Sequence, residues 1–339
     1  MQLTDFDFPF DPSLIAQHPM NPRDQARMLV VPRESGAYTH TQVVDLPTWL
    51  QAGDVLVVND TKVVPVRLQG FKSPSGGRVE MILVREHGER GWEVLLKGRV
   101  SVGQVIDLGC DAVATVVERS RTQTLVKITS QWPIPELLAR IGTMPLPPYI
   151  KRLPTTEDHQ DYQTLFAKEE GAIAAPTAGL HFTPGLLEAL TARGIQLAMV
   201  TLHVGPGTFR PVTAPDIHQH QMDMEWYDMP ESTAMLINQA KAERRRVVAV
   251  GTTAVRSIES ASVGRGNVLA QAGNTKLFIT PGYQFKVVDV LLTNFHLPRT
   301  TLLMLVSAFA GYSQVYKAYE EAILERYRFY SYGDAMLLY

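Results

Sequence analysis

Three segments in the second half of the chain share one pattern of apolar and polar positions. Each starts with a run of β-branched and other apolar residues, passes through a loop rich in Gly, Thr, Asn or His, and continues in a helical pattern. The three runs are Ile195–Val204, Val247–Val250 and Val290–Leu292. Such runs are typical of strands buried on both faces. The carboxyl ends of parallel strands meet at one edge of a sheet, so we expect the three polar loops to converge there.

A different pattern occupies residues 70 to 132. Short β-rich runs are separated there by Gly, charged or Ser/Thr turns, at roughly the 8–12-residue spacing of antiparallel sheets. The runs are Val79–Val84, Trp92–Leu96, Val105–Leu108, Val113–Val117 and Leu125–Ile128. Helical periodicity returns after Pro133. We therefore expect an α/β catalytic domain of residues 1–68 plus 150–339, interrupted by a small all-β domain of residues 69–149.

Local signals refine this picture. Thr183 followed by Pro184 predicts a helix start, because the hydroxyl can cap free N–H groups and proline fits the first helical position. Gly194 ends that helix. Thr252 and Thr253 follow a strand, where they either bind an anion at a helix N-terminus or cap the helix, and capping is the stronger expectation.

Composition restricts the class of protein. With 339 residues, 45% hydrophobic and 19% charged, the chain is typical of a globular protein with room for two domains. Cys110 is the only cysteine, which excludes an internal disulfide and CxxC motifs and favours a cytoplasmic setting. The longest apolar run, Thr301–Gly311, covers about half a bilayer and predicts a buried helix. A net charge of −2 means that any nucleic acid must be met by a local basic patch.

The segment HQHQMDME raises the possibility of a metal site. Its imidazole and carboxylate groups belong to His218, His220, Asp223 and Glu225. These side chains could converge on one ion, as in a metal-dependent hydrolase, but their spacing matches no known zinc motif. Histidines that make loop hydrogen bonds are the more common case, so we expect no metal.

Basic residues leave two interpretations open. Arg244, Arg245 and Arg246 end a helix that starts near Glu231, where cations are favourable at the negative helix end and could also bind phosphate. The same ambiguity applies to Lys151, Arg152 and Arg328. Aromatic residues near the last of these could stack on bases, but core packing is the stronger expectation. They are Tyr327, Phe329, Tyr330 and Tyr332.

Long segments spread over nearly the whole chain match one known family. They are GDVLVVNDTKVVPVRL, LPPYIKR, YQTLFA, GAIAAPTAGLHF, TLHVGPGTF, VGTTAVRSIES, TNFHLPRTTLLMLVSAFAG and YRFYSYGDAML. Together they closely resemble the S-adenosylmethionine:tRNA ribosyltransferase-isomerases of the queuosine pathway. The resemblance implies an α/β domain of barrel-like arrangement interrupted by a small β-barrel, which agrees with the change of pattern near residues 70 and 132–150.

The resemblance also implies an activity. Enzymes of this family transfer and isomerise the ribosyl part of S-adenosylmethionine onto 7-aminomethyl-7-deazaguanine at the wobble position of tRNA, giving epoxyqueuosine and releasing adenine and methionine. We therefore expect S-adenosylmethionine as a consumed co-substrate, tRNA as partner, no metal, no membrane, a cytoplasmic location and a monomer. A metal-dependent hydrolase that uses HQHQMDME and a non-catalytic tRNA-binding module remain the alternatives.

The matched motifs suggest site residues. The reaction needs a base and a protonated group near adenine, and histidine suits both tasks. We assign them to His181, His203 and His296. Arg256 would hold the methionine carboxylate or a tRNA phosphate. The expected substrate-binding residues are Pro176, Thr177, Gly205, Gly207, Glu225, Thr252, Thr253, Arg256, Asn294 and Asp334. The expected nucleic-acid-binding residues are Lys151, Arg152, Arg244, Arg245, Arg246 and Arg328.

The chain departs from the family pattern at three positions. Lys62 replaces the arginine of NDTR, Asp223 stands where a second histidine is usual, and Thr280 replaces the tyrosine of IYPG. The change at Asp223 argues against an essential proton transfer at that position and removes one ligand from the metal interpretation. None of the three departures affects the favoured histidines.

Overall fold

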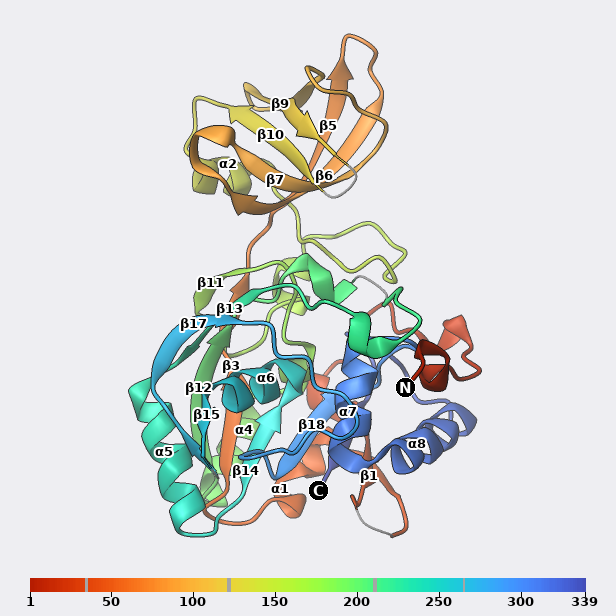
Figure 1. Cartoon of the computed structure of the whole chain (residues 1–339), viewed down its shortest axis with the longest axis vertical. Helices are drawn as coiled ribbons and strands as arrows, with labels where there is room; N and C mark the ends of the chain where they lie inside the picture. The colour runs from red at the N-terminus through yellow and green to blue at the C-terminus, as the bar shows by residue number, and fades with distance from the viewer. Residues whose placement is uncertain (34–35, 121–122, 210–211, 265) are drawn as a thin grey trace. The chain divides into compact units, whose positions relative to one another are not determined.

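The computed structural model describes residues 1–33, 36–120, 123–209, 212–264 and 266–339. The chain divides into two compact units, each traced in Figure 1. The larger unit contains Met1–Lys62, Pro148–Leu153 and Gln160–Tyr339, and the smaller contains Val63–Pro147 and Pro154–His159. No helix among these residues is long and apolar enough to cross a membrane.

A mixed nine-stranded sheet organises the larger unit, with the order β17-β13-β12-β3-β14-β18-β19-β1-β2. Its strands are β1 (Arg27–Val31), β2 (Thr39–Gln42), β3 (Val55–Asn59), β12 (Gln196–Leu202), β13 (Glu225–Met229), β14 (Val247–Val250), β17 (Gln271–Thr275), β18 (Val290–Asn294) and β19 (Ala335–Leu338). The four central strands β12, β3, β14 and β18 are parallel. Their carboxyl ends therefore share one edge, as the sequence pattern predicts.

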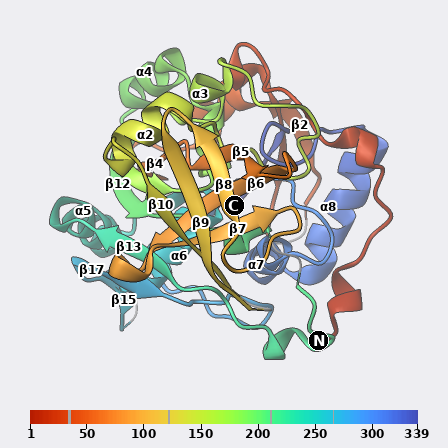
Figure 2. The ribbon, with the colours of Figure 1, turned by 90° about the horizontal axis from the view of Figure 1, so that it is seen from above.

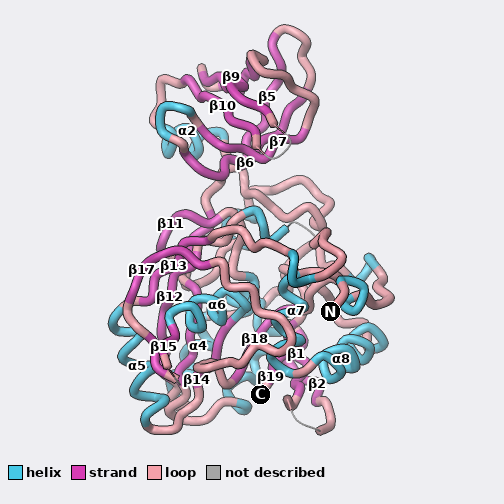
Figure 3. Tube along the Cα trace, in the orientation of Figure 1, coloured by secondary structure: helices cyan, strands magenta, loops and turns pink. Residues whose placement is uncertain are grey.

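Helices cover both faces of this sheet (Figures 1 and 3). Val55 and Val57 of β3 pack in one core cluster with the buried residues of α5, α6, α7 and α8, whereas Leu56 and Val58 pack in another with those of α1 and α4. Successive residues of one strand thus bury opposite faces, which is why the central runs are apolar throughout. The helices are α1 (Leu46–Trp49), α3 (Asp158–Asp161), α4 (Pro184–Ala192), α5 (Glu231–Ala242), α6 (Gly251–Ala261), α7 (Thr301–Ala310) and α8 (Tyr312–Leu324).

The smaller unit is built on a closed antiparallel barrel of order β10-β7-β6-β5-β8-β9, followed by helix α2 (Ile134–Ile141). Its strands are β5 (Arg67–Ser73), β6 (Arg78–Glu86), β7 (Trp92–Lys97), β8 (Val105–Gly109), β9 (Ala112–Arg119) and β10 (Thr124–Thr129). They can also be followed in Figure 2. Five of the six strands match the expected runs, and β5 was not among them. Short two-stranded sheets complete the structure, formed by β4 (Thr61–Val63) with β11 (Glu169–Ala172) and β15 (Ser262–Val263) with β16 (Asn267–Val268).

These observations confirm the expected fold class, an α/β domain with a small β-barrel. They confirm one local prediction and correct another. The Thr183 hydroxyl accepts a hydrogen bond from the Leu186 N–H at 3.2 Å and so caps α4. Helix α6 begins at Gly251, and no side chain caps it. Thr252 and Thr253 lie inside the first turn instead, so the capping expectation is wrong and both side chains are available for another role.

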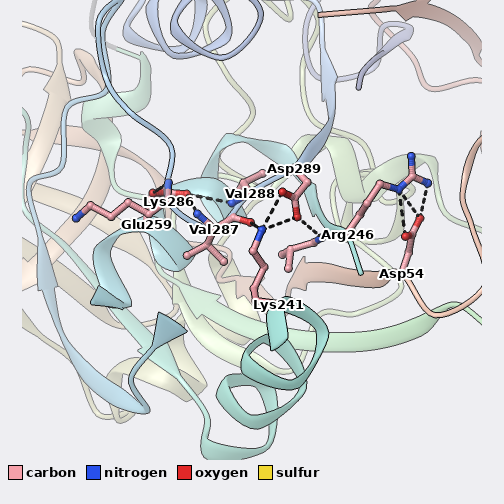
Figure 4. Close-up of polar contacts among 9 residues, drawn as sticks. Asp54, Lys241, Arg246, Glu259, Lys286, Val287, Val288 and Asp289 are labelled. Carbon is pink, nitrogen blue, oxygen red and sulfur yellow. Dashed lines mark hydrogen bonds and ion pairs between the residues drawn. The ribbon is translucent and has the colours of Figure 1, made fainter. Parts of the chain in front are cut away.

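Two carboxylates fix the chain between α6 and β18 (Figure 4). Glu259 of α6 is 3% exposed and accepts N–H groups of Lys286, Val287 and Val288 at 3.0 to 3.1 Å. The two carboxylate oxygens of Asp289 accept hydrogen bonds from Lys241 Nζ, at 2.8 and 2.9 Å. Charge-assisted bonds of this kind hold a loop backbone firmly. They set the point at which β18 enters the sheet and therefore the position of its polar carboxyl end.

Candidate functional site

A pocket lies at the carboxyl ends of the parallel strands, in the larger unit. The segment before the 3₁₀ helix Thr177–His181, the first turn of α6, the end of β18 and the start of α7 contribute most of its wall. We call it the threonine pocket. Its lining residues are Tyr149, Tyr162, Ala174, Ala175, Pro176, Thr177, Ala178, Val204, Gly251, Thr252, Thr253, Arg256, Thr293, Asn294, His296, Thr300, Leu302, Tyr330 and Ser331. The strand-end loops thus converge as the pattern predicts.

Seven residues proposed from the sequence line this pocket. They are Pro176, Thr177, Thr252, Thr253, Arg256, Asn294 and His296. The sequence reasoning missed Tyr149, Tyr162 and Ser331, and it assigned Tyr330 to core packing. The Tyr149 and Tyr330 rings are in contact, with centroids 3.8 Å apart. Burial raises the pKa of the Tyr149, Tyr162 and Tyr330 hydroxyls, so all three stay protonated at neutral pH. The matched motifs LPPYIKR, YQTLFA and YRFYSYGDAML contain these residues and carried the signal for them.

A second pocket of about 400 Å³ adjoins the first. We call it the acidic pocket, because Asp223 and Glu225 line it together with His220. Arg256 and Leu302 line both pockets, so the two cavities meet at these side chains. The other residues of its wall are Gly207, Thr213, Gln221, Met222, Leu277, Phe278, Ile279, Thr301 and Leu305.

A buried ion pair stands at the junction. The side chains of Arg256 and Glu225 are 7% and 5% exposed, and an Arg256 Nη1 to Glu225 Oε2 contact joins them. Glu225 also accepts the Gly205 N–H at 2.9 Å, and Arg256 Nε donates to the Leu277 carbonyl at 3.1 Å. Within the described part of the chain, Arg256 Nη2 and the Thr253 hydroxyl are buried without a hydrogen-bond partner. Buried polar atoms are nearly always bonded, so these two groups are suited to oxygen atoms of a ligand.

His296 is the histidine that lines the threonine pocket. It is 6% exposed, its Nε2 lies 3.0 Å from the Thr293 hydroxyl, and its backbone N–H donates to the Tyr319 hydroxyl at 2.9 Å. Burial lowers the pKa of His296 to about 3. The imidazole is therefore neutral at physiological pH, so one ring nitrogen carries a proton and the other can accept one.

His181 lies behind the pocket wall. Its Nε2 is 3.3 Å from Asn294 Nδ2, and Asn294 in turn donates to the Tyr330 carbonyl at 3.1 Å and accepts from the Thr177 hydroxyl at 3.3 Å. Burial, followed by the positive charges of Arg328 and Arg23, lowers the pKa of His181 to about 4. A neutral imidazole that accepts from Asn294 fixes the orientation of that amide, so His181 acts on the pocket through Asn294.

His203 lines neither pocket. It stacks on Trp226 with ring centroids 5.0 Å apart, and its Nδ1 lies 2.8 Å from the Thr61 hydroxyl. A Cβ added to Gly171, where φ is +151°, would come within 2.8 Å of the imidazole, so glycine leaves room for this ring. Burial lowers the pKa of His203, against the opposing charges of Asp60 and Glu169. Neither of these two pockets of the described residues brings the three histidines together.

The remaining predicted residues lie outside the threonine pocket. Asp334 is 1% exposed and accepts hydrogen bonds from the backbone N–H and the guanidinium of Arg328. This ion pair therefore has a structural role. Arg152 Nε donates to the Gln17 carbonyl at 3.0 Å. Lys151 and Arg244 are exposed. Arg245 donates to the Gly53 carbonyl and pairs with Glu243, and Arg246 binds Asp54 (Figure 4).

The metal interpretation of HQHQMDME finds no support. Among the residues that the structure describes, no group of three or more His, Cys, Asp or Glu could hold a metal ion. Glu225 is bound by Arg256, and the His220 ring packs edge-to-face on Phe278 at 5.4 Å. The segment instead forms part of the wall of the acidic pocket.

Comparison with known proteins agrees with this fold. The family model described as "Queuosine biosynthesis protein" matches residues 3–338. Relatives from Desulforamulus reducens and Geotalea uraniireducens are each 48% identical over the full length of both chains, and both are named S-adenosylmethionine:tRNA ribosyltransferase-isomerase. A crystal structure of S-adenosylmethionine tRNA ribosyltransferase from Thermotoga maritima is 34% identical, with a TM-score of 0.57, covering 99% of this chain and 100% of that one. This chain therefore belongs to the queuosine biosynthesis family of S-adenosylmethionine:tRNA ribosyltransferase-isomerases.

Proposed function

We propose that this chain transfers and isomerises the ribosyl part of S-adenosylmethionine onto 7-aminomethyl-7-deazaguanine at the wobble position of tRNA, with release of adenine and methionine. The full-length relationship to enzymes of that name supports the proposal. The structural observation that carries it is a buried pocket with two donors, Arg256 Nη2 and the Thr253 hydroxyl, that lack partners among the described residues. The relatives give no support to a hydrolase or to a non-catalytic binding module.

The threonine pocket takes the adenosyl part of the co-substrate. Thr177, Thr252, Thr253 and Asn294 offer hydroxyl and amide groups to the ribose and to the edges of adenine. The aromatic rings of Tyr149, Tyr162 and Tyr330 in the pocket wall suit a purine ring, which gains about 1–3 kcal/mol from stacking on such a surface. No described Asp or Glu lines this pocket.

His296 is the proposed acid/base group. The reaction starts with removal of a proton from the ribose carbon next to the sulfonium, whose positive charge makes that carbon acidic. A neutral imidazole in the pocket wall can take this proton. His181 orients Asn294 and is a positioning residue. His203 supports the loop next to Gly171 and Trp226.

The direct test mixes the protein, S-adenosylmethionine and tRNA that carries 7-aminomethyl-7-deazaguanine. We expect one adenine and one methionine per modified tRNA, measured by chromatography and by the mass gain of the tRNA. His296→Gln should lower the rate of adenine release by about 100-fold, the usual contribution of a general acid/base. His203→Gln should retain most of the rate. Absence of adenine release by the parent chain with competent tRNA would disprove the activity.

tRNA binding is assigned to basic residues of the larger unit. Lys151 and Arg244 are exposed and carry the positive charge that binding to a phosphate backbone requires. Arg328 and Arg246 each bind a buried carboxylate, so their contribution to tRNA is secondary. We infer that the chain works as a cytoplasmic monomer, with residues 1–68 plus 150–339 as the catalytic domain and residues 69–149 as the inserted domain.

Two arginine variants separate the structural role from the tRNA role. Arg246→Gln leaves Asp54, which is 2% exposed, without its charge partner, and should lower the free energy of unfolding by about 2–4 kcal/mol. Arg244→Gln should leave that stability within about 0.5 kcal/mol and weaken tRNA binding, more strongly at low salt. Urea unfolding and filter binding at two salt concentrations measure both effects. Equal stability of the two variants would contradict the assignment.

A further inference from the structure

The first ten residues form an arm that lies along helix α8, drawn in dark red next to the N label in Figure 1. We call residues 1–10 the N-terminal arm. The Phe6 ring packs edge-to-face on Tyr312 with centroids 5.8 Å apart, and the Phe8 ring packs in the same way on Tyr319 at 5.2 Å. Phe6 and Phe8 are 1% and 8% exposed, so the burial of two aromatic rings fixes the arm on the helix.

The arm also binds the loop that follows strand β18. This loop carries His296, and it ends at Thr300, which lines the threonine pocket and caps helix α7. The backbone N–H of Arg299 donates to the Phe6 carbonyl at 3.0 Å. An ion pair joins the Arg299 guanidinium to the Asp7 carboxylate. The arm therefore holds the loop by one backbone hydrogen bond and one charged contact.

A second contact reaches the loop at His296 itself. The Tyr319 hydroxyl accepts the His296 backbone N–H at 2.9 Å, and Phe8 of the arm packs against the Tyr319 ring. Tyr319 is 1% exposed, so neighbouring side chains hold its ring in place. The arm thus acts on this loop at two points three residues apart, directly at Arg299 and through Tyr319 at His296.

The backbone of Arg299 needs these contacts. Its φ of 58° lies in the left-handed region, where residues other than glycine are uncommon because Cβ crowds the backbone. Such a conformation persists only where the surrounding structure holds it. The Phe6 carbonyl and the Asp7 carboxylate are bound to this residue, immediately before Thr300. Without them the loop can relax, and the residues on either side of Arg299 then move.

We propose that Asp7 is a positioning residue for the reaction: through Arg299 it fixes the loop that carries His296, and so keeps the imidazole at its place in the pocket wall. Asp7 acts at a distance, because it lines neither the threonine pocket nor the acidic pocket. The assignment rests on the proposed function, in which His296 takes the proton from the ribose. The N-terminal arm is then part of the machinery that holds the base.

The first test removes the charge of Asp7 and keeps its size. Asp7→Asn should lower kcat for adenine release by about fivefold, the upper end of what an exposed ion pair contributes, and leave KM for S-adenosylmethionine within about twofold. The urea midpoint should hardly change, whereas a purely structural role would shift the midpoint and spare kcat. Glu118→Gln is the matched control, because Glu118 pairs with Arg90 at similar side-chain exposure, 44% against 43% for Asp7. It should leave kcat unchanged.

A charge exchange tests the pair itself. Asp7→Arg and Arg299→Asp each place like charges together, so each should lower kcat by about tenfold or more. The double variant restores an ion pair with reversed signs and should recover kcat to within about twofold of the parent chain. Parental kcat in Asp7→Asn would overturn the proposal. So would a folded double variant without recovery, since Arg299 would then act on the substrate directly. Failure of the proposed function is distinct, because the parent chain itself would release no adenine.

Discussion

Replacing Arg256 by methionine is expected to lower kcat/KM for adenine release by about 100- to 1,000-fold. The change removes the Nη2 donor proposed for the methionine carboxylate and leaves Glu225, 5% exposed at its side chain, without its cationic partner. Truncating one member of a buried, hydrogen-bonded charge pair costs about 2–5 kcal/mol, or about 30- to 5,000-fold, and the expected loss lies within this range. Steady-state rates with S-adenosylmethionine and modified tRNA measure the loss.

A double variant separates the two causes. Glu225→Gln alone keeps the guanidinium and removes the charge that it balances, so its activity should fall less than that of Arg256→Met. Combining the two changes should restore the stability lost in Arg256→Met, since no buried charge remains unpaired, while activity stays low. Recovery of activity in the double variant would show that Arg256 only neutralises Glu225 and does not bind substrate.

Mild acid is expected to destabilise the chain through two buried histidines. The pKa of His181 is lowered to about 4 and that of His296 to about 3, mainly by burial, whereas both titrate near 6.5 when unfolded. Below pH 6.5 the unfolded chain therefore binds protons that the native chain does not, and stability falls as pH falls. The unfolded imidazole is only half protonated at pH 6.5, so each histidine contributes less than the limiting slope of about 1.4 kcal/mol per pH unit at first. The free energy of unfolding should therefore drop by about 3 kcal/mol between pH 6.5 and 5.

Urea unfolding across this pH range checks the effect. His181→Gln and His296→Gln should each flatten the slope by about half, because glutamine does not titrate. His203 and His220 add a smaller effect of the same sign, since their pKa values are lowered by partial burial. The raised pKa of Asp60 has the opposite effect on stability, because the native carboxyl group binds a proton more readily than the unfolded one. This effect falls at lower pH, closer to the range where carboxyl groups titrate. A parent chain with constant stability from pH 6.5 to 5 would contradict the buried, neutral state of both imidazoles.

The basic residues show what a linear pattern leaves undecided. Arg244, Arg245 and Arg246 look equivalent in the sequence, at the end of one helix. In the fold, Arg246 reaches the buried Asp54, Arg245 bonds to the Gly53 carbonyl, and Arg244 stays exposed. The difference arises because Gly53 and Asp54 come from a segment nearly 200 residues away, and no local rule specifies that neighbour.

The sequence alone determined the strands that carry the polar loops and the edge at which the site lies. Fully apolar runs such as Val247–Val250 identify strands buried on both faces, and parallel strands bring their carboxyl ends together, so Thr253, Asn294 and His296 could be placed in one pocket without coordinates. Local periodicity carries this information because it depends only on which face of each strand is buried.

Only the tertiary structure decided which histidine enters the pocket and which distant residues complete it. His181, His203 and His296 sit in equally strong motifs, yet only His296 lines the threonine pocket. Tyr149 and Tyr330 are separated by some 180 residues, and their rings meet there at 3.8 Å. Side-chain direction, burial and pairing across distant segments depend on how the helices pack on the sheet, and that packing is a property of the whole fold rather than of any short stretch of sequence.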